Sequence, residues 1–317
     1  MAEVLLGGLP VERNVSLQPF TTLKAGGPAE RFLIARSCQE LADASIAAQR
    51  EGILATIIGS GSNILPADRG VPGLVILNLA RRIAVAKTGE VLSDSGCAFQ
   101  ELFLKTAQAG LRGLEYAVGI PGTLGGALVS NAGAYRSCVS EFLVELEVVA
   151  ESERRWVDPS FMHFSYRDSV LRSTAGLQCT LLRARLQLAS GDEKAIYDEA
   201  RGYQRQRIGK QPPPASAGSF FKNVNDKALA DSLPNLPQGL KDAGVVPAGF
   251  LIEAVGLKGF RMGGAMLGAR HANFMLNVGN ATASEIRALA EFAKAEVMRQ
   301  FGVLLEEEVL YLGDWAA

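Results

Sequence analysis

The sequence has few of the residues from which proteins build metal centres and disulfide frameworks. Only two histidines occur, His163 and His271, and the four cysteines are scattered without a CxxC pair. Zinc and iron sites draw mainly on clustered histidine and cysteine ligands, so we expect no metal centre. Free thiols persist in a reducing compartment, which favours a cytoplasmic protein.

An excess of charge of one sign is also absent. The 32 Lys and Arg residues almost balance the 33 Asp and Glu residues, for a formal charge of -1. A dedicated nucleic-acid binder would carry a basic surface, so we expect no nucleic-acid partner. No signal-peptide pattern opens the chain, and charges interrupt every longer apolar run, so we also expect no association with a membrane.

The length of 317 residues and the hydrophobic fraction of 48% predict substantial cores and about two domains. The first part shows a β-α-β pattern. Strands are expected at 31–35 and 55–59, and a helix between them starts with the capping-box spacing of Ser37 and Glu40 and runs to about Arg50. A further strand is expected at 71–79.

The middle of the chain predicts a helix at 99–109 and a mostly antiparallel sheet formed by strands at 142–150, 155–157 and 179–188. A charged helix at 192–208 and the proline-rich KQPPPASAG (210–218) follow, so the first domain is expected to end near Ser190. The last part predicts an amphipathic helix at 284–302 and a strand at 303–313.

Two glycine-rich segments are candidates for ligand contact. GSGSN (59–63) follows a buried strand, but Ile64 stands where a dinucleotide fingerprint needs its third glycine, and a plain turn is the commoner use of such a loop. In GIPGTLGGALVSNAGAY (119–135), five glycines fall between 119 and 133. Ordered glycine is entropically costly, which indicates backbone packed against a flat ligand or tightly against itself.

Polar residues in three other segments could carry chemistry. SAGSFFKN (216–223) contains Ser219, and because the chain has neither a GxSxG elbow nor a nearby histidine base, proton donation suits this serine better than nucleophilic attack. Arg167 lies in the strand-like FSYRDSVLR, where it could bind a carboxylate bidentately, and Glu306, Glu307 and Glu308 alternate along the last strand. Solvated ion pairs are the alternative reading of these charges.

Together these segments resemble the UDP-N-acetylenolpyruvoylglucosamine reductase family, flavoenzymes that make UDP-N-acetylmuramate for peptidoglycan. The resemblance runs from about Asn14 to Gly313. It rests on NVSLQPFTTLKAGGPAE, IIGSGSNIL, GIPGTLGGALVSNAGAY, FSYRDS, GSFFKN and the final EEEV, in the family's order. The short segment after FSYRDS resembles the family's shorter subtype, and 225–247 resembles an insertion.

The resemblance implies an α+β fold in which a two-lobed FAD-binding domain of the vanillyl-alcohol-oxidase type is joined to a separate substrate domain. The FAD domain would span 1–190, with lobes at about 1–79 and 80–190. A linker helix and the α+β substrate domain would span 191–302, and the strand at 303–317 would return to the FAD domain. We expect a monomer, although the sequence does not determine the oligomeric state.

By the same resemblance, FAD binds non-covalently and NADPH reduces it, after which the enolpyruvyl substrate is reduced in cell wall biogenesis, a process that supports cell shape and division. The catalytic residues would be Arg167, Glu308 and, as the proton donor, Ser219, while Lys210 and Asn223 would bind substrate. Residues expected at FAD are Gly59, Ser60, Gly61, Ser62, Asn63, Gly119, Ile120, Pro121, Gly122, Gly125, Gly126, Ala127, Asn131, Gly133 and Ala134.

Two alternatives stay open at this point. One is another flavin oxidoreductase of the same fold, such as a hydroxy-acid or sugar oxidase, which would share the FAD segments. The other is a catalytically silent flavin- or nucleotide-binding protein. The combination of Arg167, Ser219 and Glu308 is not expected in the oxidases, and the presence of Ser219 argues against a silent protein.

Overall fold

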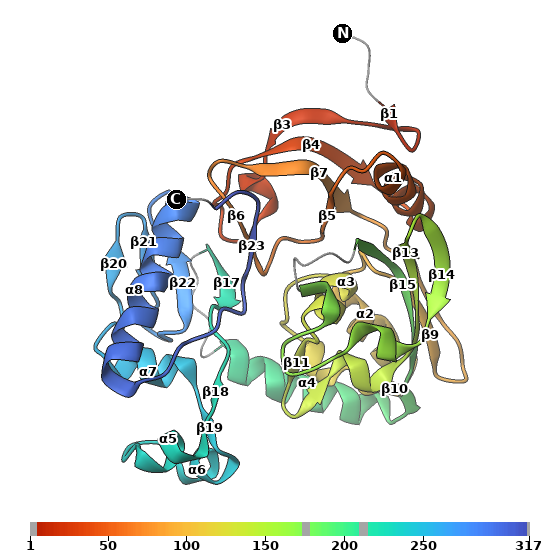
Figure 1. Cartoon of the computed structure of the whole chain (residues 1–317). Helices are drawn as coiled ribbons and strands as arrows, with labels where there is room; N and C mark the ends of the chain where they lie inside the picture. The colour runs from red at the N-terminus through yellow and green to blue at the C-terminus, as the bar shows by residue number, and fades with distance from the viewer. Residues whose placement is uncertain (1–4, 173–177, 209–214, 316–317) are drawn as a thin grey trace. The chain divides into compact units, whose positions relative to one another are not determined.

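The computed structural model describes residues 5–172, 178–208 and 215–315, which form two compact units (Figure 1). Unit 1 comprises residues 1–16, 28–61 and 71–209, and unit 2 comprises residues 17–27, 62–70 and 210–317. Two short N-terminal segments therefore belong to the same unit as the C-terminal third of the chain.

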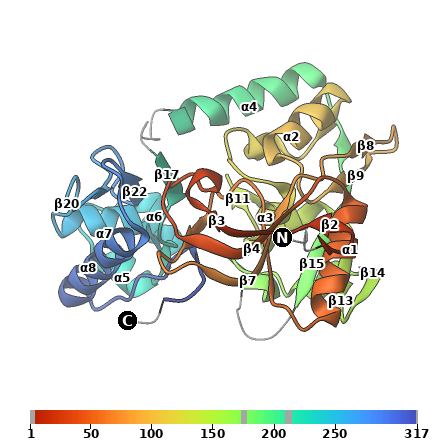
Figure 2. The same cartoon turned by 90° about the horizontal axis from the view of Figure 1, so that it is seen from above.

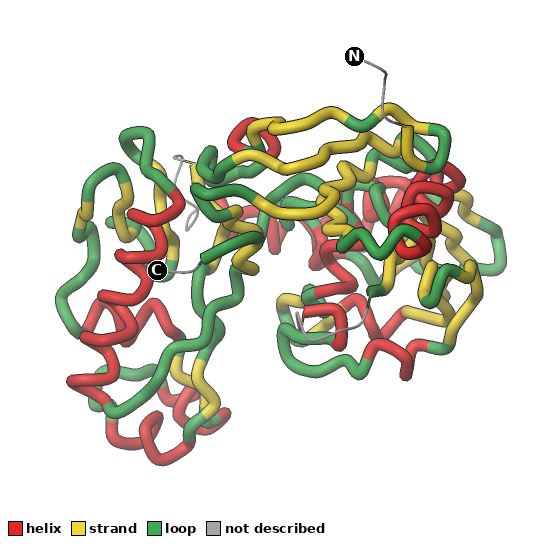
Figure 3. The backbone as a smooth tube through the Cα atoms, turned by 45° about the horizontal axis from the view of Figure 1, so that its top comes forward, coloured by secondary structure: helices red, strands yellow, loops and turns green. Residues whose placement is uncertain are grey.

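The first lobe of unit 1 is a four-stranded sheet covered by one helix. The strand order is β3 (Glu12–Ser16), β4 (Pro28–Ala35), β7 (Val71–Asn78) and β5 (Ala55–Ile58), with β4 and β5 parallel to β7. Figure 3 shows these strands running side by side. The helix α1 (Cys38–Arg50) buries Leu41, Ala44 and Ala48 against the sheet, as its spacing predicts. A hairpin of β1 (Leu5–Leu6) and β2 (Leu9–Pro10) precedes the sheet.

The start of α1 uses half of the predicted capping box. The hydroxyl of Ser37 accepts the N–H of Glu40 at 3.1 Å, as expected of an N-cap. The carboxylate of Glu40, however, accepts the N–H of Arg36 at 2.7 Å rather than that of the cap residue. The bond to Ser37 satisfies a backbone donor that the helix itself leaves unpaired, and the bond to Glu40 pairs the N–H just before the cap residue.

The second lobe of unit 1 is the predicted antiparallel sheet, in the order β14 (Glu153–Val157), β13 (Leu143–Ala150), β15 (Cys179–Gln187), β9 (Glu90–Asp94) and β8 (Ile83–Val85). It shares a hydrophobic core with α2 (Phe99–Gln108), α3 (Leu124–Val129) and α4 (Glu193–Ile208). Figure 2 shows α4 lying beside α2. Two short pairs complete the lobe, β10 (Leu111–Arg112) with β16 (Ala189–Ser190) and β11 (Gly133–Ala134) with β12 (Ser137–Cys138).

Unit 2 is built around the antiparallel sheet β17 (Ala215–Ser219), β22 (Phe274–Asn277), β21 (Ala265–Leu267) and β20 (Arg261–Met262). The helix α8 (Ala283–Phe301) buries the five predicted residues Ile286, Leu289, Ala290, Ala293 and Val297. A capping box at Thr282 starts it, and Gly302 ends it with φ +69°. The helix α7 (Ala248–Ala254) also packs on this core.

The polar stretch 225–247 forms a small elaboration of unit 2. The strands β18 (Val224–Asn225) and β19 (Val245–Val246) pair at its base, and α5 (Lys227–Ser232) and α6 (Gln238–Ala243) lie between them. Ala230, Leu233 and Leu236 are buried within the core of unit 2. The insertion is therefore folded rather than a polar loop.

The strand expected at 303–313 forms only at its end. The strand β23 (Leu310–Leu312) pairs in parallel with β6 (Ile64–Pro66), whereas residues 303–309 run as a loop that makes one isolated bridge, between Glu307 and Phe221 (Figure 1). Leu305 and Val309 are buried and Glu306 is exposed, although this loop is not assigned as a strand.

Short 3-10 helices occur at η1 (Gln18–Phe20), η2 (Glu115–Ala117), η3 (Val139–Phe142), η4 (Pro159–Met162) and η5 (Val170–Arg172). Within the three described ranges, no helix has the length and apolar character needed to cross a membrane.

A buried carboxylate joins the two lobes of unit 1. Glu147 on β13 accepts hydrogen bonds from Arg154 at 2.7 Å and Arg183 at 2.6 Å. Arg154 also donates to Gln39 on α1 at 2.8 Å, which links the second lobe to the first. Burial by itself would raise the pKa of the Glu147 carboxyl, but the two guanidinium groups outweigh it and lower that pKa below its ordinary value of 4.5.

Replacing Glu147 by Gln is expected to lower the free energy of unfolding by roughly 2 kcal/mol at pH 7, because charge-assisted hydrogen bonds are lost. The lowered pKa means that ionised Glu147 stabilises the fold fully above about pH 4.5 and progressively less as the pH falls through the folded-state pKa. Denaturant titrations should therefore show the gap between wild type and variant narrowing below that pH.

A matched control is Glu145→Gln, on the same strand, whose side chain is 34% exposed against 6% for Glu147 and pairs with Arg185 at 2.7 Å. We expect a loss of less than about 1 kcal/mol for this surface pair. A gap for Glu147→Gln that stays constant from pH 7 to pH 3 would contradict the assignment.

Candidate active site

The two glycine-rich segments meet within unit 1. GSGSN leaves the end of β5, and a Cβ atom added at Gly59 would lie 2.5 Å from the hydroxyl oxygen of Thr123. Thr123 is the N-cap of α3, where its hydroxyl accepts the N–H of Gly126 at 3.3 Å. Glycine at position 59 is therefore required by the close packing of the loop against the start of this helix.

The glycines of the 119–135 run serve two different purposes. Gly125 and Gly133 pack against protein, since an added Cβ would lie 3.0 Å from the carbonyl oxygen of Ser95 and 2.5 Å from that of Ser137. Gly126 is exposed, and a Cβ there would meet nothing closer than 3.7 Å. An exposed glycine inside a helix costs about 1 kcal/mol relative to alanine, and no packing contact explains it.

Buried polar atoms that have no hydrogen-bond partner among the described residues gather around the same run. They are the side-chain oxygen of Asn131, the hydroxyl of Tyr116 and the Nε atom of Arg207. Arg207, on α4, donates from its guanidinium to the carbonyl of Tyr116 at 3.3 Å, and burial lowers its pKa. Buried polar groups are normally satisfied, so this cluster fits a polar ligand such as FAD. Arg207 was not among the residues predicted from the sequence, because a basic residue in the last turn of a helix is common.

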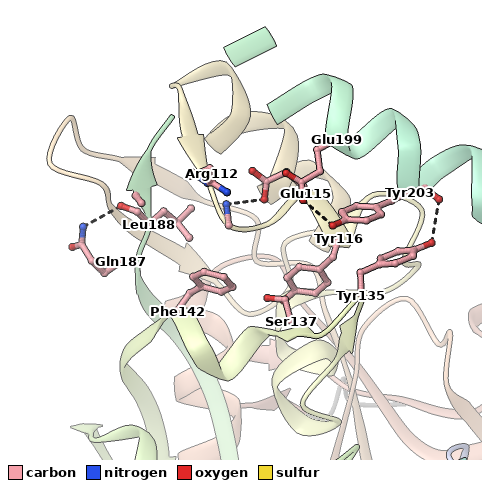
Figure 4. A pocket seen from close by; sticks show the side chains of 12 residues that line it. Arg112, Glu115, Tyr116, Tyr135, Ser137, Phe142, Gln187, Leu188, Glu199 and Tyr203 are labelled. Carbon is pink, nitrogen blue, oxygen red and sulfur yellow. Dashed lines mark hydrogen bonds between the residues drawn. The ribbon is translucent and has the colours of Figure 1, made fainter. Parts of the chain in front are cut away.

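A cavity of about 640 Å³ lies in the second lobe of unit 1 (Figure 4). The ring of Tyr203 stacks on that of Tyr135 with centroids 3.9 Å apart, and its hydroxyl donates to Glu199 at 2.7 Å. The carboxylate of Glu115 accepts the N–H of Gly113 at 2.8 Å. The described residues that line this cavity do not include those expected at FAD.

The strand expected around Arg167 does not form. Ser165 and Asp168 exchange two backbone hydrogen bonds, which close a tight turn and hold Arg167 at φ +55°. This is the left-handed region that only a few per cent of residues other than glycine occupy. Such strain persists only where surrounding contacts enforce it, and it gathers at functional sites.

Three hydrogen bonds attach this turn to the glycine-rich run. The guanidinium of Arg167 donates to the carbonyl of Gly133 at 2.5 Å, Ser169 donates to Val129 at 2.6 Å, and Asn131 donates to Ser165 at 3.0 Å. FSYRDS and the 119–135 run, separate in the sequence, are therefore one structural element of unit 1.

Ser219 ends β17 at a bulge. The pairing with β22 shifts register between Ser216 and Ser219, and Gly218 has φ +78°. A glycine in the left-handed region is a common device for such a bulge, which turns the following side chain to a new direction. The glycine before Ser219 is thus explained by the backbone, and Ser219 is half-buried.

The three glutamates near the C-terminus are held by contacts of different kinds. The side chain of Glu306 lies 3.3 Å from Lys222, and that of Glu307 lies 2.9 Å from Lys294. The backbone N–H of Glu308 donates to the carbonyl of Phe220 at 2.8 Å. Glu308 is therefore fixed beside the residue that follows Ser219.

Asn63, which is also expected at FAD, forms a side-chain hydrogen bond to the same loop. Its amide nitrogen donates to the carbonyl of Glu308 at 2.9 Å, and its own carbonyl accepts the N–H of Leu310 at 3.0 Å. GSGSN therefore spans both units, with Gly59 in unit 1 and Asn63 in unit 2.

The two residues expected at substrate differ in what the structure shows of them. Asn223 uses its side-chain oxygen to accept the N–H of Ala248, the first residue of α7, at 3.3 Å. Lys210 lies outside the described residues.

Comparison with known proteins covers both units. Residues 29–156 match the family model described as FAD binding domain, and residues 209–312 match UDP-N-acetylenolpyruvoylglucosamine reductase, C-terminal domain. The UDP-N-acetylenolpyruvoylglucosamine reductases of Synechococcus sp. (strain JA-3-3Ab) and Caldicellulosiruptor saccharolyticus are 36% and 35% identical to this chain, with 96% of it and 92% of each relative covered. The crystal structure of the reductase from Thermus caldophilus is 31% identical, with a TM-score of 0.75, and 96% of this chain and 99% of that chain are covered.

The chain belongs to the UDP-N-acetylenolpyruvoylglucosamine reductase family. Membership in this reductase family confirms the predicted fold class, a two-lobed FAD-binding domain of the vanillyl-alcohol-oxidase type with a second α+β domain. It also confirms the prediction of an FAD-binding oxidoreductase.

Gly126→Ala is expected to separate ligand binding from stability in this reductase. In the FAD-depleted protein the variant should be as stable as wild type or more stable by up to about 1 kcal/mol, since alanine favours a helix. Its affinity for FAD should fall about tenfold or more, because a methyl group would occupy the open surface. Thermal unfolding and flavin fluorescence titration measure the two effects.

The neighbouring Gly125→Ala is the control, because its methyl group would press on Ser95 and destabilise the fold by about 1–3 kcal/mol. If Gly126→Ala bound FAD as tightly as wild type, the exposed face of α3 would not be a contact surface for the cofactor.

Proposed function

We propose that this chain reduces UDP-N-acetylenolpyruvoylglucosamine to UDP-N-acetylmuramate in the cytoplasmic synthesis of peptidoglycan precursors, with NADPH as the reductant. Within the family, the observation that supports this best is the backbone hydrogen bond of 2.8 Å between Glu308 and Phe220. It ties the predicted acid Glu308 to the residue that follows the predicted proton donor Ser219, and this combination of residues is not expected in a sugar or hydroxy-acid oxidase.

Unit 1 is the proposed site of FAD, held by the GSGSN loop and by residues 119–134. The exposed Gly126 and the unpartnered Asn131 oxygen support this assignment. Bound FAD would supply the redox chemistry, accepting a hydride from NADPH and passing it to the enolpyruvyl alkene. Unit 2 is the proposed site of the sugar nucleotide, with Lys210 and Asn223 binding its polar groups.

The proposed roles of the catalytic residues follow from where charge develops. Hydride addition to an enolpyruvyl ether leaves negative charge on the carbon that bears the carboxylate, and a preorganised cation and acid stabilise such charge. Arg167 is the proposed cation, since its guanidinium can bind a carboxylate, and Glu308 is the proposed polarising acid. Ser219 gives its hydroxyl proton to that carbon, and an alcohol is acidic enough because the carbanion is a very strong base.

All of the proposed catalytic residues come from one chain, so a monomer is sufficient for the reaction. Arg167 belongs to unit 1, and Ser219 and Glu308 belong to unit 2. Each unit therefore supplies part of the proposed machinery, and neither unit alone is expected to complete the reaction.

An anaerobic stopped-flow experiment on the purified flavoprotein tests the proposal. NADPH should bleach the flavin absorbance, and UDP-N-acetylenolpyruvoylglucosamine should then restore it rapidly. A flavin that bleaches but does not recover with this substrate would point to another acceptor within the same fold. If the purified protein contained no flavin and bound none on reconstitution, the assignment of unit 1 as the site of FAD would be contradicted.

Ser219→Ala should leave reduction of the flavin by NADPH within about twofold of wild type, because no proton from this residue is needed in that step. Reoxidation by the enolpyruvyl substrate should slow by about 10²- to 10⁴-fold, the usual contribution of a positioned proton donor. The same stopped-flow traces report both rates.

Ser216→Ala is the matched control, since Ser216 lies on the same strand and pairs with Leu276 of β22. It should change neither rate by more than about twofold. An equal loss in both half-reactions for Ser219→Ala would remove the proton-donor role from this residue.

A further inference from the structure

Asn273 holds the backbone that follows Ser219. Its side-chain oxygen accepts the N–H of Phe221 at 2.9 Å, and its amide nitrogen donates to the carbonyl of the same residue at 2.8 Å. Its own backbone carbonyl accepts the N–H of Phe220 at 2.8 Å. Asn273 is 3% exposed and Phe221 is 1% exposed, so these bonds have no competition from water.

The geometry explains why asparagine serves here. The strand β22 begins at Phe274, which pairs with Ser219, and the regular pairing of the two strands ends at that point. A side-chain amide carries a donor and an acceptor side by side, as a peptide group does. Asn273 therefore extends the pattern of strand pairing by one residue after the backbone has ended it.

The opposite edge of the same segment carries Glu308. Phe221 bridges Glu307, with Glu308 donating to the carbonyl of Phe220 and Lys222 donating to that of Glu306, both at 2.8 Å. Both backbone polar groups of Phe221 and the N–H of Phe220 therefore face Asn273, while the carbonyl of Phe220 and the N–H of Lys222 bind the loop. One short segment thus sets the position of Ser219 on one side and of Glu308 on the other.

We propose that Asn273 is a positioning residue of the reductase, which sets Ser219 and Glu308 in register through the segment 220–221 without itself touching substrate or cofactor. This inference rests on the proposed function, because it assigns these two residues their roles. Asn63 completes the arrangement by donating to the carbonyl of Glu308 at 2.9 Å.

Loss of the two hydrogen bonds between the Asn273 side chain and Phe221 would mainly change the position of the segment 220–221. Without the amide, the N–H and carbonyl of Phe221 would be buried and unpaired, and the segment would have to move to satisfy them. A displacement of about 1 Å at a catalytic group can cost roughly a hundredfold in rate. The step that uses Ser219 and Glu308 should therefore be slowed selectively.

The test compares Asn273→Ala with Asn277→Ala in the full-length flavoprotein. Asn277 lies on the same strand and also clamps backbone, with its amide donating to Leu23 at 2.9 Å and its oxygen accepting from Ala281 at 2.9 Å. The two variants lose comparable hydrogen bonds and should lose comparable thermal stability. Of these two asparagines, Asn273 alone is bonded to the segment that follows Ser219.

For Asn273→Ala we expect reoxidation of the flavin by UDP-N-acetylenolpyruvoylglucosamine to slow by about a hundredfold, with reduction by NADPH within about twofold of wild type. Asn277→Ala should keep both rates within about twofold. The hydroxyl of Asn273→Ser can bond only one of the two Phe221 groups, so the reoxidation rate of this variant should lie between those of wild type and Asn273→Ala. The serine variant replaces Asn273→Ala in the test if the alanine variant does not fold.

A second readout does not depend on turnover. Hydrogen exchange of the peptide containing Phe221, measured by mass spectrometry on the holoenzyme without substrate, should accelerate at least tenfold in Asn273→Ala and stay unchanged in Asn277→Ala.

Equal slowing of both half-reactions in Asn273→Ala, unchanged exchange at Phe221, or the same selective loss in Asn277→Ala would overturn the positioning role. Failure of the wild-type flavin to recover with the enolpyruvyl substrate is a different result, since it would overturn the proposed function itself. In that case, faster exchange in Asn273→Ala would show a structural clamp with no part in this reaction.

Discussion

The backbone hydrogen bond from Glu308 to Phe220 is the constraint on which the proposed chemistry of unit 2 depends. It fastens a C-terminal loop to the segment after Ser219, although the two are far apart in the sequence. The loop has little regular structure of its own, and its place is set by this bond, by Lys222 on Glu306 and by Asn63 on the carbonyl of Glu308. Ser219 as the proposed proton donor and Glu308 as the proposed polarising acid need a fixed separation. Backbone hydrogen bonds hold the segments that carry them together.

In unit 1, close packing at glycines and a strained backbone turn fix the position of Arg167. Gly59 lets the GSGSN loop pack against the start of α3, Gly125 lets α3 approach Ser95, and Gly133 lets the β11–β12 hairpin close tightly. The turn that carries Arg167 is tied to residues 129–133 by three hydrogen bonds, which enforce a backbone conformation that arginine seldom adopts. Packing glycines and an exposed glycine look identical in a sequence, yet among Gly59, Gly125, Gly126 and Gly133 only Gly126 has open space at the Cβ position.

The sequence predicted correctly the features that depend on local residue patterns. It failed for features that depend on contacts with distant segments. The amphipathic spacing in α1 and α8 predicted which residues are buried, because a helix has one period and one apolar face. The residues 303–309 have strand-like composition but pair with another segment only at the bridge between Glu307 and Phe221, so only β23 is a regular strand. Arg207 and Asn273 were missed because a lone arginine or asparagine has no pattern, and their importance lies in contacts that folding creates.

The sequence by itself determined the family, the α+β class, the flavin and the candidate residues Arg167, Ser219 and Glu308, since ordered motifs over nearly the whole chain record them directly. The tertiary structure decided which glycines pack and which one is exposed, that Arg167 sits in a strained turn, and that Asn63 binds the loop of Glu308. The physical reason is that hydrogen bonds and close contacts between distant segments have no sequence period. They come into being only when the chain brings those segments together.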